Sequence, residues 1–312
     1  MDNTPLISVL IPAYNAEATI RETLESIQSQ CFSDFEAVVV DDGSTDCTPQ
    51  IAGEFATSDT RFRLISKVNG GTASAYNEGL KSMRGEYAAL CAADDVLLPE
   101  CLYVHSRSIE ERKGFDVFTS NGYFFHDNEG WKRVARKGAN WGDAREVTLI
   151  DLAHSCIFGV GTVFSRQSAL NVGGMRTSLA DDYDLWVRMM IEGSRFWYTP
   201  EKLALFRIST TQRSAGFAEM DTAHRTVLED ALESPGIPAS DATIIAEALK
   251  QFDSSQISPD ERLAMERQRS QVYDSINRLP KPLRPLFGWL VGILSPLARP
   301  LRRLLVKRGP ML

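Results

Sequence analysis

Four nearly continuous apolar runs alternate with amphipathic segments over the first hundred residues. A run that is apolar at almost every position is typical of a strand buried on both faces of a parallel sheet. Between the runs, apolar residues recur at helical spacing, as at Ile20, Leu24 and Ile27. This alternation predicts an α/β fold with a doubly wound, mostly parallel sheet flanked by helices. The predicted strands are Leu6–Pro12, Phe35–Val40, Arg61–Ser66 and Tyr87–Cys91, and the predicted helices are 17–30, 72–83 and a segment ending near Ala56.

The pattern is less regular after a predicted helix at 99–113. Shorter apolar runs bounded by turn residues predict further strands, and two segments with helical spacing predict helices. Beyond them, 220–277 is typical of two or three polar helices, interrupted at Ser234 and Ser258. The expected strands are 115–119, 122–126, 160–164, 196–198 and 203–206, with a hairpin partner at 131–135 and a loop at 140–146; the expected helices are 167–171 and 182–191.

Two adjacent carboxylates, Asp94 and Asp95, follow the fourth predicted strand. Open α/β sheets bind ligands beyond the carboxyl ends of their strands. Burying two carboxylates side by side is costly unless a cation shares them, and hard divalent cations also bind phosphate oxygens. The pair therefore predicts a metal-dependent site for a nucleotide diphosphate. The simpler alternative is that Asp95 caps the helix beginning near Pro99 while Asp94 faces water.

The first strand-to-helix turn, Pro12–Asn15, contains neither a GxGxxG nor a GxxxxGK loop. Dinucleotide dehydrogenases and P-loop NTPases are therefore disfavoured. The ring of Tyr14 and the amide of Asn15 stand instead where a base and a ribose could lie. Asp41 and Asp42 follow the second strand and can accept hydrogen bonds from either group. Taken singly, each feature is also explained by packing, by a turn or by a helix cap.

Together, six motifs resemble, in order and spacing, those of the family 2 glycosyltransferases, which have the GT-A fold. The resemblance extends from about Pro5 to Arg213 and is specific because all the motifs occur jointly. It implies transfer of a sugar from a nucleotide diphosphate sugar, commonly a UDP-sugar, with inversion at the anomeric carbon. The motifs are Ile11–Glu17, Val40–Asp46, Asn69–Asn77, Ala93–Pro99, Gly173–Gly174 and Asp181–Arg188.

The resemblance assigns a donor site by position. Tyr14 would stack on or border the base, Asp41 would bond the base, and Asp42 would lie close by. Asp94 would lie nearer the ribose or the donor sugar. The expected nucleotide-sugar contacts are Pro12, Ala13, Tyr14, Asn15, Asp41, Asp42, Asn77 and Asp94.

The resemblance also assigns the metal site and the catalytic base. Asp95 would be the direct ligand of Mg²⁺ or Mn²⁺, with Asp94 beside it. Asp182 would be the general base, and its place at a helix N-terminus favours the ionised carboxylate. Asp181 stands where relatives more often have Glu and is the second candidate for the base. Phosphate or acceptor contacts are expected from Trp186, Arg207 and Arg213.

Three other positions depart from the family pattern. Ala92 replaces a frequent Asp of the metal motif, Tyr76 stands where many relatives have Arg, and Ser209 stands where relatives often have His. These changes favour the alternative of a catalytically silent module that binds nucleotide sugar or docks other enzymes at the membrane. A nucleotidyltransferase is disfavoured because Pro12–Asn15 is not a basic, glycine-rich loop.

The expected domains follow from these motifs and from the uneven distribution of charge. The net charge is −7, yet eight basic and no acidic residues lie from Arg278 to the end, so that tail carries +8 and the remainder −15. Such a body is poorly suited to nucleic acid, whereas the tail suits an anionic membrane surface. The expected units are a GT-A catalytic domain at 1–215, with a nucleotide-sugar half of about 1–100 and an acceptor half of about 101–215, a helical extension at 216–277 and a basic amphipathic tail at 278–312.

The tail contains fourteen uncharged residues between Arg284 and Arg299, whereas a spanning helix needs about 20. Leucines alternating with basic residues after Arg299 predict a helix lying in the membrane interface, and the alternative is packing on protein. Five cysteines without CxxC spacing predict reduced thiols. Because Met1–Pro5 also lacks a basic n-region, we expect no signal peptide and a cytoplasmic protein that can contact the inner leaflet. Four histidines show no ligand spacing, so we expect them to be structural or exposed.

We therefore predict an inverting, metal-dependent, hexosyltransferase-type glycosyltransferase. Its expected partners are a nucleotide-sugar donor and a glycan or lipid-linked acceptor, and its expected setting is surface polysaccharide synthesis.

Overall fold

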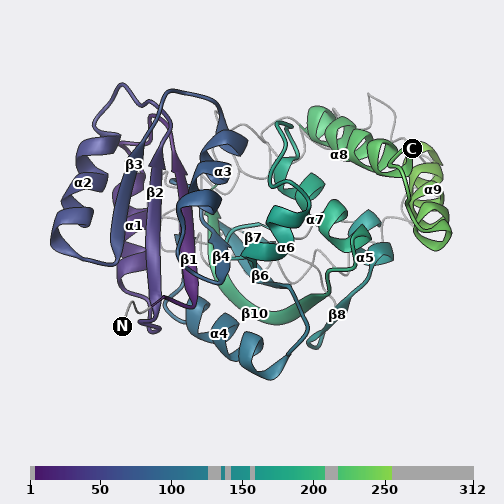
Figure 1. Cartoon of the computed structure of the whole chain (residues 1–312), viewed down its shortest axis with the longest axis horizontal. Coiled ribbons are helices and arrows are strands. Elements are labelled where there is room, and N and C mark those ends of the chain that lie inside the picture. The colour runs from purple at the N-terminus through teal and green to yellow at the C-terminus, as the bar shows by residue number, and fades with distance from the viewer. Residues whose placement is uncertain (1–3, 126–134, 138–141, 155–158, 208–216, 255–312) are drawn as a thin grey trace, which may run out of the picture.

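The computed structural model describes residues 4–125, 135–137, 142–154, 159–207 and 217–254. These residues form one mixed sheet with helices on both faces (Figure 1). The strands are β1 Ile7–Ala13, β2 Phe35–Asp41, β3 Phe62–Ser66, β4 Tyr87–Leu90, β5 Val96–Leu97, β6 Val117–Phe125, β7 Ala135–Lys137, β8 Arg145–Val147, β9 Val163–Ser165 and β10 Phe196–Arg207. The helices are α1 Ile20–Gln28, α2 Thr48–Ser58, α3 Thr72–Ser82, α4 Cys101–Glu111, α5 Leu149–His154, α6 Arg166–Asn171, α7 Asp181–Ile191, α8 Phe217–Leu232 and α9 Ala239–Ser254.

The sheet order is β3-β2-β1-β4-β9-β6-β10-β5, with β7 beside β6 and β8 beside β10. The adjacent strands β3, β2, β1 and β4 are parallel to one another, which confirms the sheet predicted for the first hundred residues. β9 lies antiparallel to both β4 and β6, so the sheet becomes mixed in its second half. The register pairs Ala13 with Asp41, and the ends of β1 and β2 therefore lie side by side.

The alternation of side chains along β1 divides the core into two layers. Val9 and Ile11 pack in one layer with Leu24 of α1, whereas Leu10 packs in the other with Leu80 of α3. The second layer continues through Trp186 of α7 to α8 and α9, at the far end of the molecule from α2 (Figure 1). This second layer therefore joins the first strands to α8 and α9, the helices that follow the sheet.

The structure joins two pairs of segments that the sequence predicts as separate strands. β6 is continuous through Gly122, where a Cβ atom would lie 2.7 Å from the backbone oxygen of Ala204 in β10. Glycine is needed for this close approach of the two strands rather than for a turn. β10 is continuous because irregular register between Thr199 and Ala204 accommodates Pro200 within the strand.

Short elements are the other differences from the predicted pattern. β8 occupies part of the segment expected to be a loop, and α5 follows it directly. β5 has two residues, too few to show a period. β7 pairs with β6 as the expected hairpin partner would, although most of the segment 131–135 lies outside the described residues.

The helices α8 and α9 bury apolar side chains against the rest of the protein, although the sequence predicts polar helices in this region. Val227 and Leu228 of α8 and Ile245 of α9 are buried in the core layer that contains α5 and α7. The described part of the predicted extension thus packs against α5 and α7, while the tail at 278–312 lies outside the described residues. Among the residues described, no helix is both long enough and apolar enough to span a bilayer.

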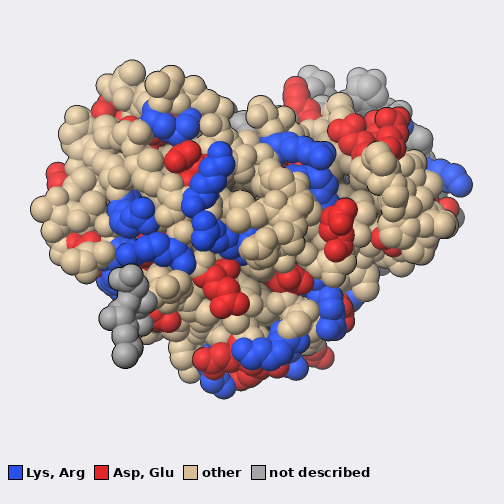
Figure 2. Space-filling model, in the orientation of Figure 1, with Lys and Arg blue, Asp and Glu red and all other residues tan. Residues whose placement is uncertain are grey.

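Charges of both signs are interspersed over the face shown in Figure 2. On α4, Arg107 forms ion pairs with Glu110 and Glu111 at 2.8 and 2.7 Å. Such exposed pairs contribute little to stability, typically about 0.3–0.5 kcal/mol each. The described residues of this face therefore present a mixed polar surface.

His105 lies fully buried on α4, and neither ring nitrogen has a hydrogen-bond partner within the described part of the chain. Burial lowers the pKa of His105 from 6.5 to about 4. The unfolded chain therefore binds a proton that the folded protein excludes, so the stability present above pH 6.5 falls by about 3 kcal/mol as the pH drops to 4. We expect His105→Leu to remove this pH-dependent loss, measured by urea unfolding between pH 7 and pH 4.5.

The exposed His154, replaced by Gln, is the matched control and should keep the wild-type pH dependence. An unchanged slope in His105→Leu would contradict the assignment of the titration to His105.

Candidate nucleotide-sugar site

The turn after β1 is bound to the loop after β2. The backbone N–H of Asn15 donates to Ser44 Oγ at 3.0 Å, and Asn15 Oδ1 accepts from the N–H of Thr45 at 2.8 Å. Asn15 also adopts a left-handed backbone, with φ of 48°. Its amide oxygen therefore joins the two loops, whereas the ring of Tyr14 projects from the turn with 53% of its surface exposed.

Asp41 and Asp42 are both buried but have different partners. Asp41 accepts a hydrogen bond from the N–H of Ser44 at 3.1 Å. Asp42 accepts from Lys67 Nζ at 2.6 Å and from the N–H groups of Gly70 and Gly71 at 3.0 and 2.7 Å. Asp42 therefore anchors the loop that leads into α3, and Asp41 has the geometry closer to that expected of a base or ribose contact.

Asp94 and Asp95 form a turn at the carboxyl end of β4, as predicted. Asp95 is 2% exposed, and its Oδ1 accepts from the backbone N–H of Arg207 at 2.8 Å. The hydroxyl of Thr23 in α1 donates a hydrogen bond to the backbone oxygen of Asp95 at 2.7 Å. The Arg207 guanidinium donates to Asp94 O at 2.5 Å and to Glu22 at 2.8 Å. Arg207 therefore supports the Asp94–Asp95 turn, and the phosphate or acceptor contact expected of it stays a prediction.

Asp181 and Asp182 begin α7. Asp181 is 4% exposed and its Oδ1 accepts from the N–H of Asp182 at 3.0 Å, whereas Asp182 is half-buried. Burial raises the pKa of Tyr76 well above 10, and the charges of Asp181, Asp95 and Asp182 raise it further. The carboxylates of Asp95 after β4 and of Asp181 and Asp182 in α7 therefore all act on one phenol, although they are distant in sequence.

The donor atoms after β4 suit a divalent cation. Asp94 and Asp95 offer hard carboxylate oxygens, and Mg²⁺ is commonly held by one or two carboxylates together with substrate phosphates. Within the described ranges, no group of three or more His, Cys, Asp or Glu side chains could hold a metal ion. The two carboxylates thus fit a cation whose remaining ligands are phosphate and water.

Four other residues are predicted for the site, and the structure describes three of them. Trp186 is fully buried and packs edge to face against Phe164, with ring centroids 5.2 Å apart, which favours a core role over a ligand contact. Pro12 and Ala13 are the last residues of β1. Arg213 lies outside the described residues.

Two structural contacts of the site were not predicted from the sequence. Lys67 follows β3 and pairs with Asp42, and the parallel order of the sheet is the signal that could have placed it there. Asn77 bonds the backbone of Met175, which the sequence spacing does not indicate.

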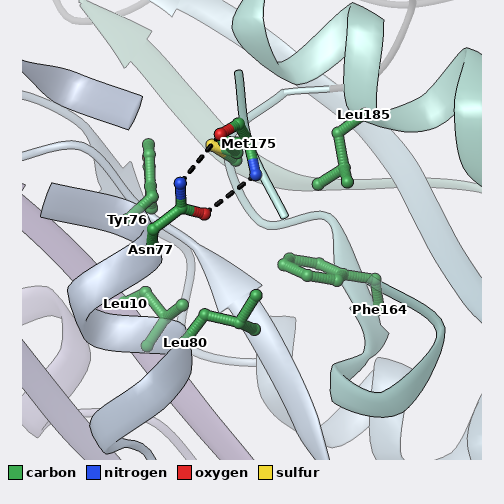
Figure 3. A pocket seen from close by; sticks show the side chains of 7 residues that line it. All are labelled: Leu10, Tyr76, Asn77, Leu80, Phe164, Met175 and Leu185. Atoms are coloured by element: carbon green, nitrogen blue, oxygen red, sulfur yellow. Dashed lines mark hydrogen bonds between the residues drawn. The ribbon is translucent and has the colours of Figure 1, made fainter. Parts of the chain in front are cut away.

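A small apolar cavity lies beside Asn77 and Met175 and extends to Phe164 and Leu185 (Figure 3). Its volume is about 10 Å³, room for no more than one water molecule. This cavity is therefore too small to hold a sugar and is a packing defect between the two halves.

The mixed sheet, with carboxylates after β4 and at the start of α7, has the arrangement of a GT-A-type fold. The chain belongs to glycosyl transferase family 2, whose family model matches residues 8–172. Among its relatives, the chain is 30% identical over 217 residues to an uncharacterized glycosyltransferase of Rickettsia prowazekii, covering 67% of this chain and 66% of that one. It is also 40% identical over 97 residues to the putative glycosyltransferase EpsH of Bacillus subtilis, covering 31% and 28%. The chain thus spans less than two thirds of either relative.

Solved structures show the same fold at low sequence identity. S. aureus TarS, residues 1–349 in complex with UDP-GlcNAc, is 22% identical, with a TM-score of 0.65 over 91% of this chain and 86% of that one. The mannosyltransferase PcManGT from Pyrobaculum calidifontis, in complex with GDP-Man and Mn²⁺, is 16% identical, with a TM-score of 0.58 over 93% and 88%.

Proposed function

We propose that this protein transfers a sugar from a UDP-sugar to a hydroxyl group of a glycan or lipid-linked acceptor, with inversion at the anomeric carbon. The observation that carries the proposal is that carboxylates from two separate elements, Asp95 after β4 and Asp181 and Asp182 at the start of α7, act on the same buried phenol of Tyr76 and raise its pKa. Carboxylates from separate elements could serve the two partners of a displacement. The family, and the UDP-GlcNAc bound by TarS, support a nucleotide-sugar donor.

The donor would bind along the carboxyl ends of β1, β2 and β4. The exposed ring of Tyr14 is available to stack on the base, and Asp41 can accept a hydrogen bond from a base or a ribose hydroxyl. Asp95, with Asp94 beside it, would hold Mg²⁺ or Mn²⁺. When bound, this cation would offset the negative charge that develops on the departing diphosphate.

Asp182 is assigned as the general base. Its position in the first turn of α7 favours the ionised carboxylate, and its side chain is less buried than that of Asp181. It would accept the proton of the acceptor hydroxyl as the oxygen attacks the face of the sugar opposite the diphosphate. Asp181, whose oxygen accepts from the N–H of Asp182, orients that residue.

We further propose that the protein acts in surface polysaccharide synthesis at the inner face of the membrane. The basic, leucine-rich sequence of 278–312 supports this setting. Lipid-linked acceptors are held at such a surface.

A donor panel tests the proposed function. The full chain is incubated with UDP-, GDP- and dTDP-sugars in Mn²⁺, Mg²⁺ or chelator, and release of the nucleoside diphosphate is measured. We expect metal-dependent release from a UDP-sugar, increased by acceptor. Binding of a nucleotide sugar without turnover would favour a catalytically silent module, and binding of none would favour a docking protein.

A further inference from the structure

The segment between α6 and α7 is held by a single side chain of the donor half. Asn77 of α3 donates from Nδ2 to the backbone oxygen of Met175 at 2.8 Å, and its Oδ1 accepts from the N–H of Met175 at 2.8 Å (Figure 3). The N–H group and the oxygen of the Asn77 amide thus both bond the backbone of Met175, in the acceptor half. We call this pair of hydrogen bonds the Asn77–Met175 clamp.

The backbone beside the clamp favours glycine at two successive positions. Gly173 and Gly174 have φ of +83° and +72°, a conformation that side chains rarely adopt. A Cβ atom on Gly174 would also overlap Asn77 Oδ1. The paired glycines therefore allow the chain to turn while lying directly against Asn77.

The same segment is fixed to α7 from its other side. Arg188 of α7 donates to the backbone oxygens of Val172 and Gly174 at 2.5 and 2.7 Å. The buried Asp184 accepts two hydrogen bonds from this guanidinium, at 2.9 and 2.5 Å. The segment is therefore connected to α3 by Asn77 and to α7 by Arg188.

We propose that Asn77 is a positioning residue that sets the place of Asp182 relative to the bound donor. α7 begins at Asp181 shortly after Met175, so the clamp fixes the start of the helix against the half that holds Asp95. The sequence predicts a direct nucleotide contact for Asn77, whereas in this role its amide uses one donor and one acceptor on Met175. The inference rests on the proposed function, in which Asp182 is the base.

The test compares Asn77→Ala with Asn171→Ala, an exposed asparagine at the end of α6 just before the same segment. Misplacing a catalytic group by about 1 Å can cost about 100-fold in rate. We therefore expect Asn77→Ala to lower kcat about 100-fold, while the donor KM and the Kd of UDP with Mn²⁺ stay within about threefold of wild type. Asn171→Ala should match wild type in all three quantities.

A second measurement does not depend on turnover. Amide hydrogen exchange in 172–181 should be faster in Asn77→Ala than in wild type and unchanged in Asn171→Ala. If Asn77→Ala does not fold, Asn77→Asp keeps an acceptor for the Met175 N–H and removes the donor, and it should show the same pattern.

Two results would overturn the clamp. A tenfold or larger rise in the Kd of UDP with kcat preserved would make Asn77 a nucleotide contact, and unchanged kcat and exchange would remove any positioning role. Absence of donor turnover in the wild type contradicts the proposed function instead, and the exchange data still decide whether Asn77 holds the segment.

Discussion

Replacing Asp182 with asparagine should lower kcat by about 10²–10⁴-fold while the donor KM changes little. The amide has nearly the shape of the carboxylate but cannot accept the proton of the acceptor hydroxyl, and general base catalysis contributes about this much. In the proposed site the donor is held by residues after β1, β2 and β4 rather than by Asp182, so its affinity should be preserved. The measurement is the initial rate of glycosylated product at saturating donor over a range of acceptor concentrations.

Two matched variants separate catalysis from helix stability. Asp241→Asn changes an aspartate in the first turn of α9, away from the converging carboxylates, and should leave the rate unchanged. Asp181→Asn should reduce the rate less than Asp182→Asn, because Asp181 is assigned to orienting its neighbour. A larger loss in Asp181→Asn would transfer the role of base to Asp181.

Replacing Asp95 with asparagine should abolish the dependence of donor binding on Mn²⁺ and lower kcat/KM about 1,000-fold. Stabilisation of transition-state charge by a cation is worth several kcal/mol, and about 4 kcal/mol corresponds to this factor. Asparagine is chosen over alanine because its oxygen can still accept from the N–H of Arg207, which would otherwise lose a buried partner. Calorimetric titration of UDP with and without Mn²⁺, together with steady-state rates, measures both effects.

The control for Asp95 is Asp34→Asn. Asp34 is exposed and directly precedes β2, so it lies at the amino end of that strand, opposite the end that carries Asp41. It removes the same charge and should leave metal-dependent binding intact. If Asp95→Asn retains the wild-type response to Mn²⁺, Asp95 is not the metal ligand and the assignment of this carboxylate is wrong.

The first half of the sheet could be predicted because its signal is local. Each of β1, β2 and β4 is buried on both faces, so the strand itself carries a continuous apolar run. β10 could not be predicted as one strand, because Pro200 is compatible with a strand only through irregular pairing with β6. That pairing depends on the neighbouring strand β6, so the sequence of β10 alone does not indicate it.

The site, like the sheet, could be predicted only in part from the sequence. Motif spacing predicts site roles for Asp95 and Asp182, and the charges of both raise the pKa of Tyr76. Spacing could not indicate that Asn77 bonds Met175, 98 residues away, or that Arg207 bonds Asp95, 112 residues away. Such partners are set by the order of strands in the sheet, so a side chain chosen for its chemistry can be held by backbone from a distant segment.

Burial of Val227, Leu228 and Ile245 has a practical consequence for dissecting this protein. A chain ended near residue 215 would keep every carboxylate assigned here, yet it would expose to water the apolar surface of α5 and α7 that α8 and α9 cover. Exposed apolar surface of this kind promotes aggregation. The smallest soluble fragment should therefore include both helices.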